Sequence, residues 1–293
     1  MRMIRLGLLC GVVFSGLFIF ALGLRSWVFK EPKVYDCFPF FNEFEVLRIR
    51  LDELHDVVDY FVLVESIETQ RGHPKPLYFE ENKHLFAPYL DKIIHVAVRE
   101  THPELKGWGR EKFQRNCIAR GLKGKCRSKD LIIISDLDEI PRREVISQIR
   151  NLLDQGNEAV RLHQDIYYYK LNWQNPLGKT HGGEDWIGTV ATNYKHFSRH
   201  KRRAQYFRDR RNSTRWPLIQ RAGWHFSSMG GNDAIRKKFF SVIEGGDNIP
   251  SDTDLERSFQ RFHAVPIDES FPEYIRNHYE TLRASGYIAE LSP

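Results

Sequence analysis

Residues 130–141, which read DLIIISDLDEIP, constrain the fold of this 293-residue chain more than any other stretch. Residues 131–134 are all apolar and suit a strand that is buried on both faces, as in a mainly parallel sheet. Three carboxylates, Asp136, Asp138 and Glu139, follow this run. Open α/β sheets bind their ligands at the carboxyl ends of the strands. The stretch therefore predicts an α/β fold with a charged site at the edge of its sheet.

Asp136 and Asp138 are the first candidates for binding a metal ion. They are two residues apart, and in an extended segment such side chains point in the same direction. Carboxylates this close together destabilise one another unless a positive partner lies between them. Hard carboxylate oxygens suit Mg²⁺ or Mn²⁺, which also keep positions for phosphate oxygens. The alternative is a charged loop after a core strand that binds no metal.

The charge of the chain favours anionic ligands. Its formal net charge of +6 suits nucleotide sugars or a membrane surface. Zinc-finger spacing, an RNP motif and a long basic helix are all missing from the sequence, so no nucleic-acid partner is expected. The four cysteines form no CxxC or Cys/His pattern. Pairing of Cys117 with Cys126 is one option and would leave Cys37 free, while Cys10 lies in an N-terminal apolar run.

That N-terminal run, residues 6–24, carries no charge over 19 residues, and roughly 20 apolar residues cross a bilayer. We expect a short cytosolic tail, a transmembrane signal anchor, a stem and a lumenal domain, at residues 1–5, 6–24, 25–33 and 34–293. The alternative is a cleaved signal peptide, with Ala21 and Gly23 at the cleavage site and a secreted product. Asn212 begins an N-S-T glycosylation sequon, which is compatible with a lumenal location.

The segments before and after the central strand alternate between helical and strand patterns. Residues 42–59 carry apolar side chains at helical spacing, with charge on the other face. Expected strands are 60–65, 93–98, 131–134 and 159–163, and expected helices are 42–59, 108–121, 142–155 and 272–282. This alternation is typical of an α/β sheet with crossover connections. The strand at 60–65 also ends in a carboxylate, Glu65, which we expect to lie near the same ligand.

Four segments, in this order, resemble glycosyltransferase family 17 over about residues 35–285: NEFEVLRIRLDELHDVVDYFVLVES, GHPKPLYF, LIIISDLDEIP and GWHFS. The resemblance implies a type II Golgi membrane protein with a GT-A-like lumenal domain that binds a nucleotide sugar. It implies inverting transfer of GlcNAc from UDP-GlcNAc to a mannose of an N-linked glycan on a glycoprotein, in β-1,4 linkage. It also implies a divalent cation, Mn²⁺ or Mg²⁺.

The resemblance assigns roles to residues of the matching segments. Asp136 and Asp138 match the acidic motif of the family and would bind the cation. His225 matches the histidine of its Gly-Trp-His segment and is expected as a third metal ligand. Glu139 is expected to contact the donor sugar or to support the ligands.

The remaining site residues are expected from the chemistry of transfer. Arginines, namely Arg115 or some of Arg202 and Arg203, would add fixed positive charge at the phosphate oxygens of the departing UDP. An inverting transfer also needs a base that takes the proton of the acceptor hydroxyl. Glu184 and Asp185, in HGGEDW, are the first candidates because they lie beside glycines and an aromatic residue.

Two other functions are compatible with parts of the sequence. A phosphatase of the haloacid-dehalogenase type also has an apolar strand that ends in DxD. That motif continues as DxDx(T/V), however, whereas Ile140 and Pro141 follow the acidic residues of this chain. A membrane-anchored glycan-binding protein without catalytic activity could keep the fold and the acidic residues. Glycan binding without donor hydrolysis or transfer would distinguish it from an enzyme.

Overall fold

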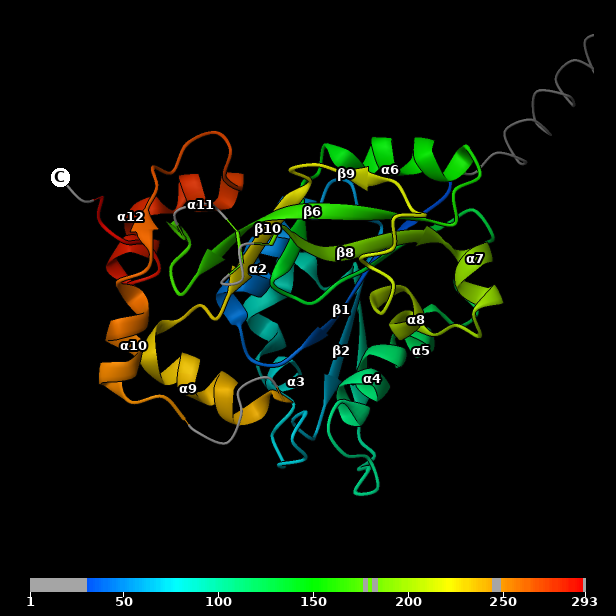
Figure 1. Cartoon of the computed structure of the whole chain (residues 1–293). Helices are drawn as coiled ribbons and strands as arrows, with labels where there is room; N and C mark the ends of the chain where they lie inside the picture. The colour runs from blue at the N-terminus through cyan, green and yellow to red at the C-terminus, as the bar shows by residue number, and fades with distance from the viewer. Residues whose placement is uncertain (1–30, 176–178, 181–183, 244–248, 292–293) are drawn as a thin grey trace, which may run out of the picture. The chain divides into compact units, whose positions relative to one another are not determined.

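A mixed sheet of nine strands runs through Lys33–Pro293, one of the two compact units into which the chain divides (Figure 1). Its strands are β1 (Val34–Phe40), β2 (Tyr60–Ser66), β3 (Ile93–Val98), β4 (Leu131–Ile134), β5 (Glu139–Pro141), β6 (Ala159–Tyr168), β8 (Trp186–Asn193), β9 (Leu218–Ile219) and β10 (Gly223–Ser227). Eight of them follow the order β3-β2-β1-β4-β8-β6-β10-β5, and β9 pairs with β6. Five strand pairs are parallel and three are antiparallel, which confirms the predicted mainly parallel α/β sheet. A separate two-stranded sheet joins β7 (Trp173–Gln174) to β11 (His263–Ala264).

The computed structural model describes residues 31–175, 179–180, 184–243 and 249–291. The predicted tail at 1–5, the predicted span at 6–24, Cys10 and most of the predicted stem at 25–33 lie outside these residues. Within the described ranges, every helix is too short or too polar to cross a membrane. The three cysteines in these ranges, Cys37, Cys117 and Cys126, are free thiols.

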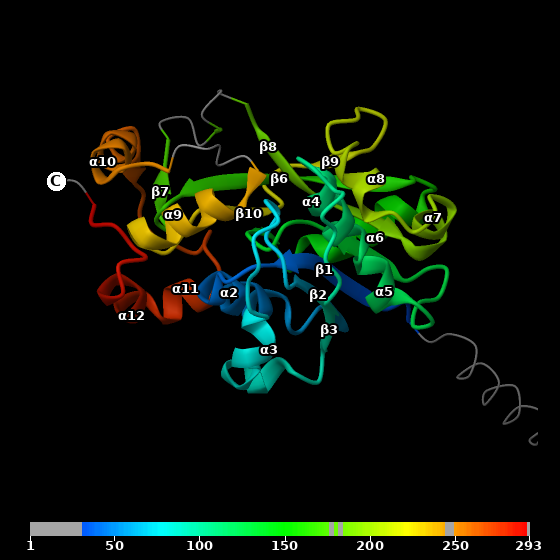
Figure 2. The same ribbon diagram turned by 90° about the horizontal axis from the view of Figure 1, so that it is seen from below.

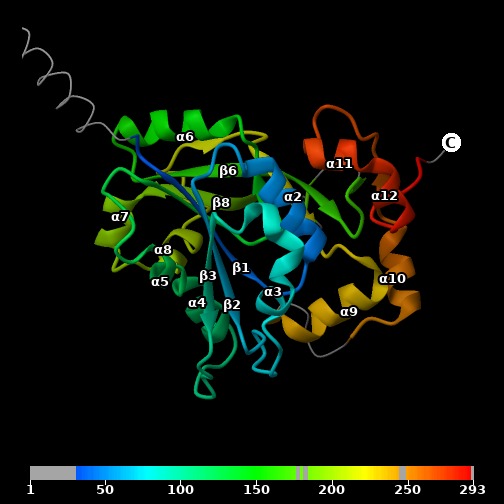
Figure 3. The same cartoon turned by 180° about the vertical axis from the view of Figure 1, so that it is seen from behind.

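Helices cover both faces of the sheet. One face packs against α2 (Phe44–Leu54), α3 (Tyr78–Asn82), α6 (Val145–Asp154), α11 (Glu273–Asn277) and α12 (Tyr279–Ala284). Figure 3 shows α2 and α3 in front of the strands on this face. The other face packs against α4 (Gly109–Asn116), α5 (Ile118–Leu122), α7 (Tyr194–Arg199) and α8 (Ala204–Arg208). Two further helices, α9 (Gly231–Ser241) and α10 (Asp252–Phe259), lie together at the end of this unit that is far from α5 and α7 (Figure 2).

The predicted elements differ from the observed ones mainly in their ends. The strands β3 and β4 have the predicted bounds, whereas β6 continues to Tyr168. The predicted helix at 108–121 is divided at Cys117 into α4 and α5, and the one at 272–282 is divided at His278 into α11 and α12. The helix predicted at 42–59 ends at Leu54. The GWHFS segment is a strand, β10.

The direction of the strands brings several chain segments to one edge of the sheet. The strands β1, β2 and β4 are parallel to one another. Because β8 is antiparallel to both β4 and β6, β6 and its parallel partner β10 share this direction. The carboxyl ends of all five strands therefore lie at one edge. The strand order changes direction between β1 and β4, and such switch points are where open α/β sheets bind ligands.

Candidate functional site

A cavity of about 470 Å³ lies at this carboxyl edge of the sheet. Its walls come from the ends of β1, β6 and β10, the segments after β2 and β4, the first residue of β8, and the helices α4, α8 and α9. Six carboxylate residues line it: Glu43, Glu68, Glu111, Asp136, Asp138 and Glu139. Three lining residues are lysine or arginine, namely Lys75, Arg208 and Lys238. The lining is therefore rich in charge, and carboxylates outnumber cations.

The acidic loop, residues 136–139, does not continue the extended conformation of β4. It forms a turn in which the backbone N–H of Glu139 donates to the carbonyl oxygen of Asp136 at 3.1 Å. The alternation of side chains along a strand therefore does not apply to Asp136 and Asp138. The structure places these two carboxylates beside different partners, whereas the sequence argument directed both toward one ion.

Asp136 lies between two arginines. Its Oδ1 accepts from Arg115 Nη2 at 2.7 Å, and its Oδ2 accepts from Arg208 Nη2 at 2.6 Å. Burial by itself would raise the pKa of Asp136, but the two guanidinium groups hold it well below its usual range. Arg115 also pairs with Glu111 at 2.5 Å. Asp136 is therefore ionised, and both of its oxygens already have cationic partners.

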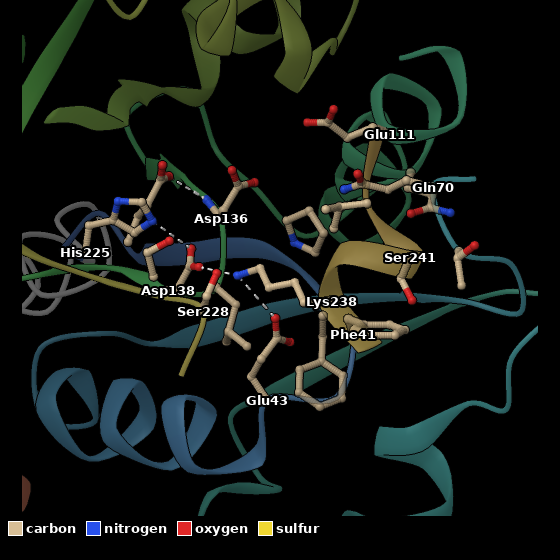
Figure 4. Close-up of a pocket in the computed structure, with 18 of the residues that line it drawn as sticks. Phe41, Glu43, Gln70, Glu111, Asp136, Asp138, His225, Ser228, Lys238 and Ser241 are labelled. Atoms are coloured by element: carbon tan, nitrogen blue, oxygen red, sulfur yellow. Dashed lines mark hydrogen bonds and ion pairs between the residues drawn. The ribbon is translucent and has the colours of Figure 1, made fainter. Parts of the chain in front are cut away.

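Asp138 faces Lys238 and His225 instead (Figure 4). Its Oδ2 accepts from Lys238 Nζ at 2.8 Å, and its Oδ1 lies 3.6 Å from His225 Nε2. Burial opposes ionisation, but these two neighbours hold the pKa of Asp138 far below its usual range. The His225 ring stacks on Trp186, with 4.5 Å between the ring centroids. Among the residues that the structure describes, none forms a hydrogen bond with the buried Nδ1 of His225.

Glu139 is fully buried and points into the protein fold. Its Oε2 accepts from the backbone N–H of Asp136 at 2.8 Å and from Arg208 Nη1 at 2.7 Å. Its Oε1 accepts from Trp186 Nε1 at 3.1 Å. Glu139 therefore fixes the acidic loop, Arg208 and Trp186 relative to one another. This arrangement places it among the supports of the site.

Arg50, on α2, binds the backbone of the acidic loop. Its side chain is fully buried and forms two hydrogen bonds with Asp36, at 2.6 and 2.7 Å. Its Nη1 also donates to the carbonyl oxygens of Asp136, Leu137 and Glu139, at 2.9, 3.0 and 3.1 Å. One side chain therefore ties α2 and β1 to the backbone of the loop. Arg50 could not be identified from the sequence, because the apolar spacing of this helix predicts that its charges lie on the exposed face.

Glu65 lies at the end of β2 as expected, but it is not part of the cavity lining. It accepts from the backbone N–H of Phe79 at 2.8 Å, at the start of α3, and from His95 Nε2 at 3.2 Å. Lys75 lines the cavity nearby, with its Nζ 3.9 Å from Glu65 Oε1. Burial lowers the pKa of Lys75 to about 8 although Glu65 opposes this shift. Glu65 therefore supports α3 and Lys75. Of Glu65 and Lys75, only Lys75 lines the cavity and can contact a ligand there.

The structure places Glu184 and Asp185 outside the cavity lining. Both are exposed, and Asp185 Oδ1 lies 3.5 Å from Lys179 Nζ and 3.9 Å from His163 Nε2 in a second, more open cavity. The next residue, Trp186, does line the first cavity. Neighbouring residues of an extended segment point to opposite sides, which explains why Asp185 and Trp186 separate.

Of the arginines expected at the site, Arg115 reaches Asp136, whereas Arg202 and Arg203 are exposed on the turn between α7 and α8. The inward residue of this basic stretch is Arg208, at the end of α8, which is 7% exposed. The sequence feature that pointed to Arg208 was the run of nine Lys and Arg in residues 195–215. The run does not indicate which of these side chains faces the protein interior. Lys238 had no sequence signal.

The residues that could hold a divalent cation are Asp138 and His225. In the described parts of the chain, no group of three or more His, Cys, Asp or Glu side chains is placed to hold a metal ion. Asp136, Asp138 and His225 therefore do not form one preassembled ligand set. A carboxylate oxygen and an imidazole nitrogen 3.6 Å apart nevertheless fit an ion of the Mg²⁺ or Mn²⁺ type, which uses few protein ligands and takes others from phosphates and water.

Comparison with known proteins gives a family match over most of the chain. The sequence model of glycosyltransferase family 17 matches residues 21–229. Beta-1,4-mannosyl-glycoprotein 4-beta-N-acetylglucosaminyltransferase of Rattus norvegicus is 30% identical over 224 residues, which cover 70% of this chain and 41% of the relative. The Homo sapiens protein of the same name is 29% identical, with 70% and 42% covered. The match thus spans about two fifths of the length of these curated relatives.

Solved structures show similarity at low identity. A mannosyltransferase from Pyrobaculum calidifontis, in complex with GDP-Man and Mn²⁺, has 13% identity and a TM-score of 0.40, covering 97% of this chain and 86% of that one.

Proposed function

The chain belongs to glycosyltransferase family 17, and from this membership we propose that it transfers GlcNAc from UDP-GlcNAc to a mannose of an N-linked glycan. The proposed linkage is β-1,4, with inversion at the anomeric carbon. We also propose that residues 6–24 anchor the protein in the Golgi membrane, with residues 34–293 in the lumen. The observation that carries the proposal is the charged cavity at the switch point of the sheet, where Asp136, Asp138 and His225 come together with Arg115 and Arg208.

The charge of the cavity supports a donor that enters together with a cation. Six lining carboxylates face three lining lysines and arginines, so a diphosphate without a counterion would be repelled. Asp138 and His225 would hold Mn²⁺ or Mg²⁺, and the phosphates of the donor would supply further ligands. When bound, such a cation acts as a Lewis acid that stabilises charge on the departing diphosphate.

The two arginines at Asp136 give the site fixed positive charge. Arg115 and Arg208 are held by Asp136, and Arg208 is held further by Glu139 and the carbonyl oxygen of Gly188. Burial disfavours their charge, but these carboxylates raise the pKa of both guanidinium groups, so they stay protonated. Positive groups that are oriented before the reaction stabilise developing negative charge without reorganising. We propose that Arg208, which lines the cavity, acts on the phosphate oxygens of the donor and that Arg115, which is outside the lining, acts through Asp136.

The base of the reaction must lie within hydrogen-bond reach of the acceptor hydroxyl. Glu184 and Asp185 lie outside the cavity, so we now place the base among the carboxylates that line it. Tyr168, Trp186 and Phe239 line the same cavity and offer aromatic faces for a sugar ring.

The proposed function is tested by incubating the purified protein with a panel of UDP-sugars, Mn²⁺ and defined N-glycans, and by following the glycans by mass spectrometry. We expect one added N-acetylhexosamine with UDP-GlcNAc and no product without a divalent cation. An unchanged mass of every glycan with UDP-GlcNAc, for a folded protein, would contradict the proposal. Glycan binding without transfer would instead indicate a binding protein.

A further inference from the structure

Helix α9 brings a lysine to the acidic residues of the cavity. Its residues Lys238, Phe239 and Ser241 line the wall. The helix begins after Gly230, and Gly230 and Gly231 have φ values of 107° and 81°, in the left-handed region that favours glycine. In Figure 4 the side chain of Lys238 extends from this helix toward Asp138 and Glu43.

The ammonium group of Lys238 connects two carboxylates from different parts of the chain. Its Nζ lies 2.8 Å from Asp138 Oδ2, in the acidic loop, and 3.7 Å from Glu43 Oε1, at the start of α2. The two contacts make an ion pair with Asp138 and a longer one with Glu43. The lysine therefore neutralises the carboxylate that is best placed to bind a cation.

Asp138 differs from Asp136 in the kind of cation that it meets. Each oxygen of Asp136 accepts a hydrogen bond from an arginine, Arg115 or Arg208, and Arg208 also binds Glu139. Asp138 binds a lysine on a flexible four-carbon stem, and its second oxygen has only a 3.6 Å contact with His225. A divalent ion at Asp138 and His225 would lie beside the ammonium group, and like charges this close repel strongly.

We propose that Lys238 is an internal counterion that occupies the place of the divalent cation: it neutralises Asp138 and Glu43 until the cation binds, and it then leaves Asp138. The freed ammonium stays on α9 at the cavity wall, where the phosphates of a donor are its next anionic partners. This inference rests on the proposed use of a divalent cation, but its test does not depend on sugar transfer.

The test is Mn²⁺ binding by isothermal titration calorimetry, on the full chain without nucleotide. Lys238→Met keeps most of the apolar stem and removes the charge. We expect it to bind Mn²⁺ at least about tenfold more tightly than the wild type, because the ion no longer has to displace an ammonium group. The matched control is Lys237→Met. Lys237 is the preceding residue of α9, and its Nζ lies over the ring of Tyr78 at 4.4 Å. We expect its Mn²⁺ affinity to stay within about twofold of the wild type.

Unchanged or weaker Mn²⁺ binding in a folded Lys238→Met protein would overturn the proposal, as would equal tightening in Lys237→Met. Absence of Mn²⁺ binding in both the wild type and Lys238→Met would also overturn it. Sugar transfer is scored separately. Tighter Mn²⁺ binding without any transfer would support the counterion and count against the proposed function.

A second measurement uses the wild-type chain and does not depend on the folding of a variant. Brief acetylation of amines is followed by peptide mass spectrometry across a Mn²⁺ titration. We expect modification of Lys238 to rise as Mn²⁺ binds, while modification of Lys237 stays constant. A Lys238 that remains equally protected at saturating Mn²⁺ would contradict its release.

Discussion

Replacement of Arg50 by methionine tests whether the acidic loop depends on the buried ion pair beneath it. Arg50 and Asp36 are both fully buried, and their guanidinium and carboxylate groups lie 2.6 Å apart. Methionine fills much of the volume of the arginine stem but supplies no donor and no charge. Asp36 would therefore remain in the core without a partner, and three carbonyl oxygens of the acidic loop would lose a donor.

The magnitude follows from these losses. Removing one partner of a buried ion pair costs about 3–5 kcal/mol. The carbonyl oxygens of Asp136 and Glu139 keep hydrogen bonds from the Glu139 backbone N–H and from Thr189 Oγ1, so the carbonyl oxygen of Leu137 is the acceptor that adds most, at about 1–3 kcal/mol unless water replaces the donor. We expect Arg50→Met to lower the free energy of unfolding by about 5 kcal/mol, which is a large part of the stability of an ordinary domain. The acidic loop should also become less ordered, since Arg50 contacts the carbonyl oxygens of Asp136, Leu137 and Glu139.

The assay is urea unfolding followed by tryptophan fluorescence, arranged as a double-mutant cycle. Arg50→Met, Asp36→Asn and the double variant are compared with the wild type. Because the main cost of Arg50→Met is an unpaired buried charge, the double variant should be more stable than Arg50→Met alone by about 2 kcal/mol. A loss below about 1 kcal/mol in Arg50→Met would refute the reasoning. A double variant whose loss equals the sum of the two single losses would refute it as well.

Three further predictions concern other parts of the chain. Burial raises the pKa of Glu53 from 4.5 to about 7, although a hydrogen bond from the backbone N–H of Arg143 opposes this shift. Because the pKa of the folded state is the higher one, the free energy of unfolding should fall by up to about 3 kcal/mol as the pH rises from 4.5 to 7. Glu53→Gln should remove this pH dependence in urea unfolding. A Cβ on Gly188 would overlap with the carboxyl group of the buried Glu139, so Gly188→Ala should lower the melting temperature and the transfer rate. Gly109→Ala, whose nearest contact is 3.4 Å, should leave both nearly unchanged. Asn212 is exposed, so expression through a secretory pathway should add a glycan that an N-glycosidase removes and that Asn212→Gln lacks; an unmodified Asn212 there would count against a lumenal location.

The apolar runs of the sequence were sufficient to predict the central strands. The strands β3 and β4 have the predicted bounds because β4 is a run of four apolar residues and β3 has five apolar residues out of six, with His95 as the exception. The strand β1, VYDCFPF, could not be recognised in this way, because Asp36 and Pro39 interrupt its apolar pattern. Asp36 is acceptable in the core only because Arg50, fourteen residues further along the chain, is its partner. This pairing is a tertiary contact that no local pattern indicates.

The helix predicted at 42–59 also contains charges whose burial no local pattern indicates. Its apolar spacing was correct, but the interpretation that its charges lie on the exposed face was wrong for Arg50 and Glu53. Both are buried, because Asp36 pairs with the first and the backbone N–H of Arg143 donates to the second. A charge with a partner elsewhere in the chain cannot be assigned to a helix face from spacing alone.

The sequence indicated Asp136, Asp138, His225 and Arg115 at the candidate site, but it did not single out Arg208 or Lys238. Asp136 and Asp138 follow β4 and His225 lies in β10, and the carboxyl ends of these strands are at the same edge of the sheet, so their positions in sequence were informative. These two cations reach the same cavity from different helices: Arg208 lies on α8 and Lys238 on α9. Their inward orientation depends on the packing of these helices, which the sequence pattern does not encode.

Transfer of a sugar from a nucleotide donor in this cavity is tested most directly by the rate of GlcNAc transfer from UDP-GlcNAc in matched variants. Asp138→Asn removes the carboxylate beside His225, Arg208→Gln removes a cation in the cavity lining, and Arg202→Gln removes an exposed arginine outside it. We predict that the first two lower the rate by about a hundredfold or more and that Arg202→Gln retains it. Wild-type rates in folded Asp138→Asn and Arg208→Gln proteins would contradict the assignment of this cavity as the site of transfer.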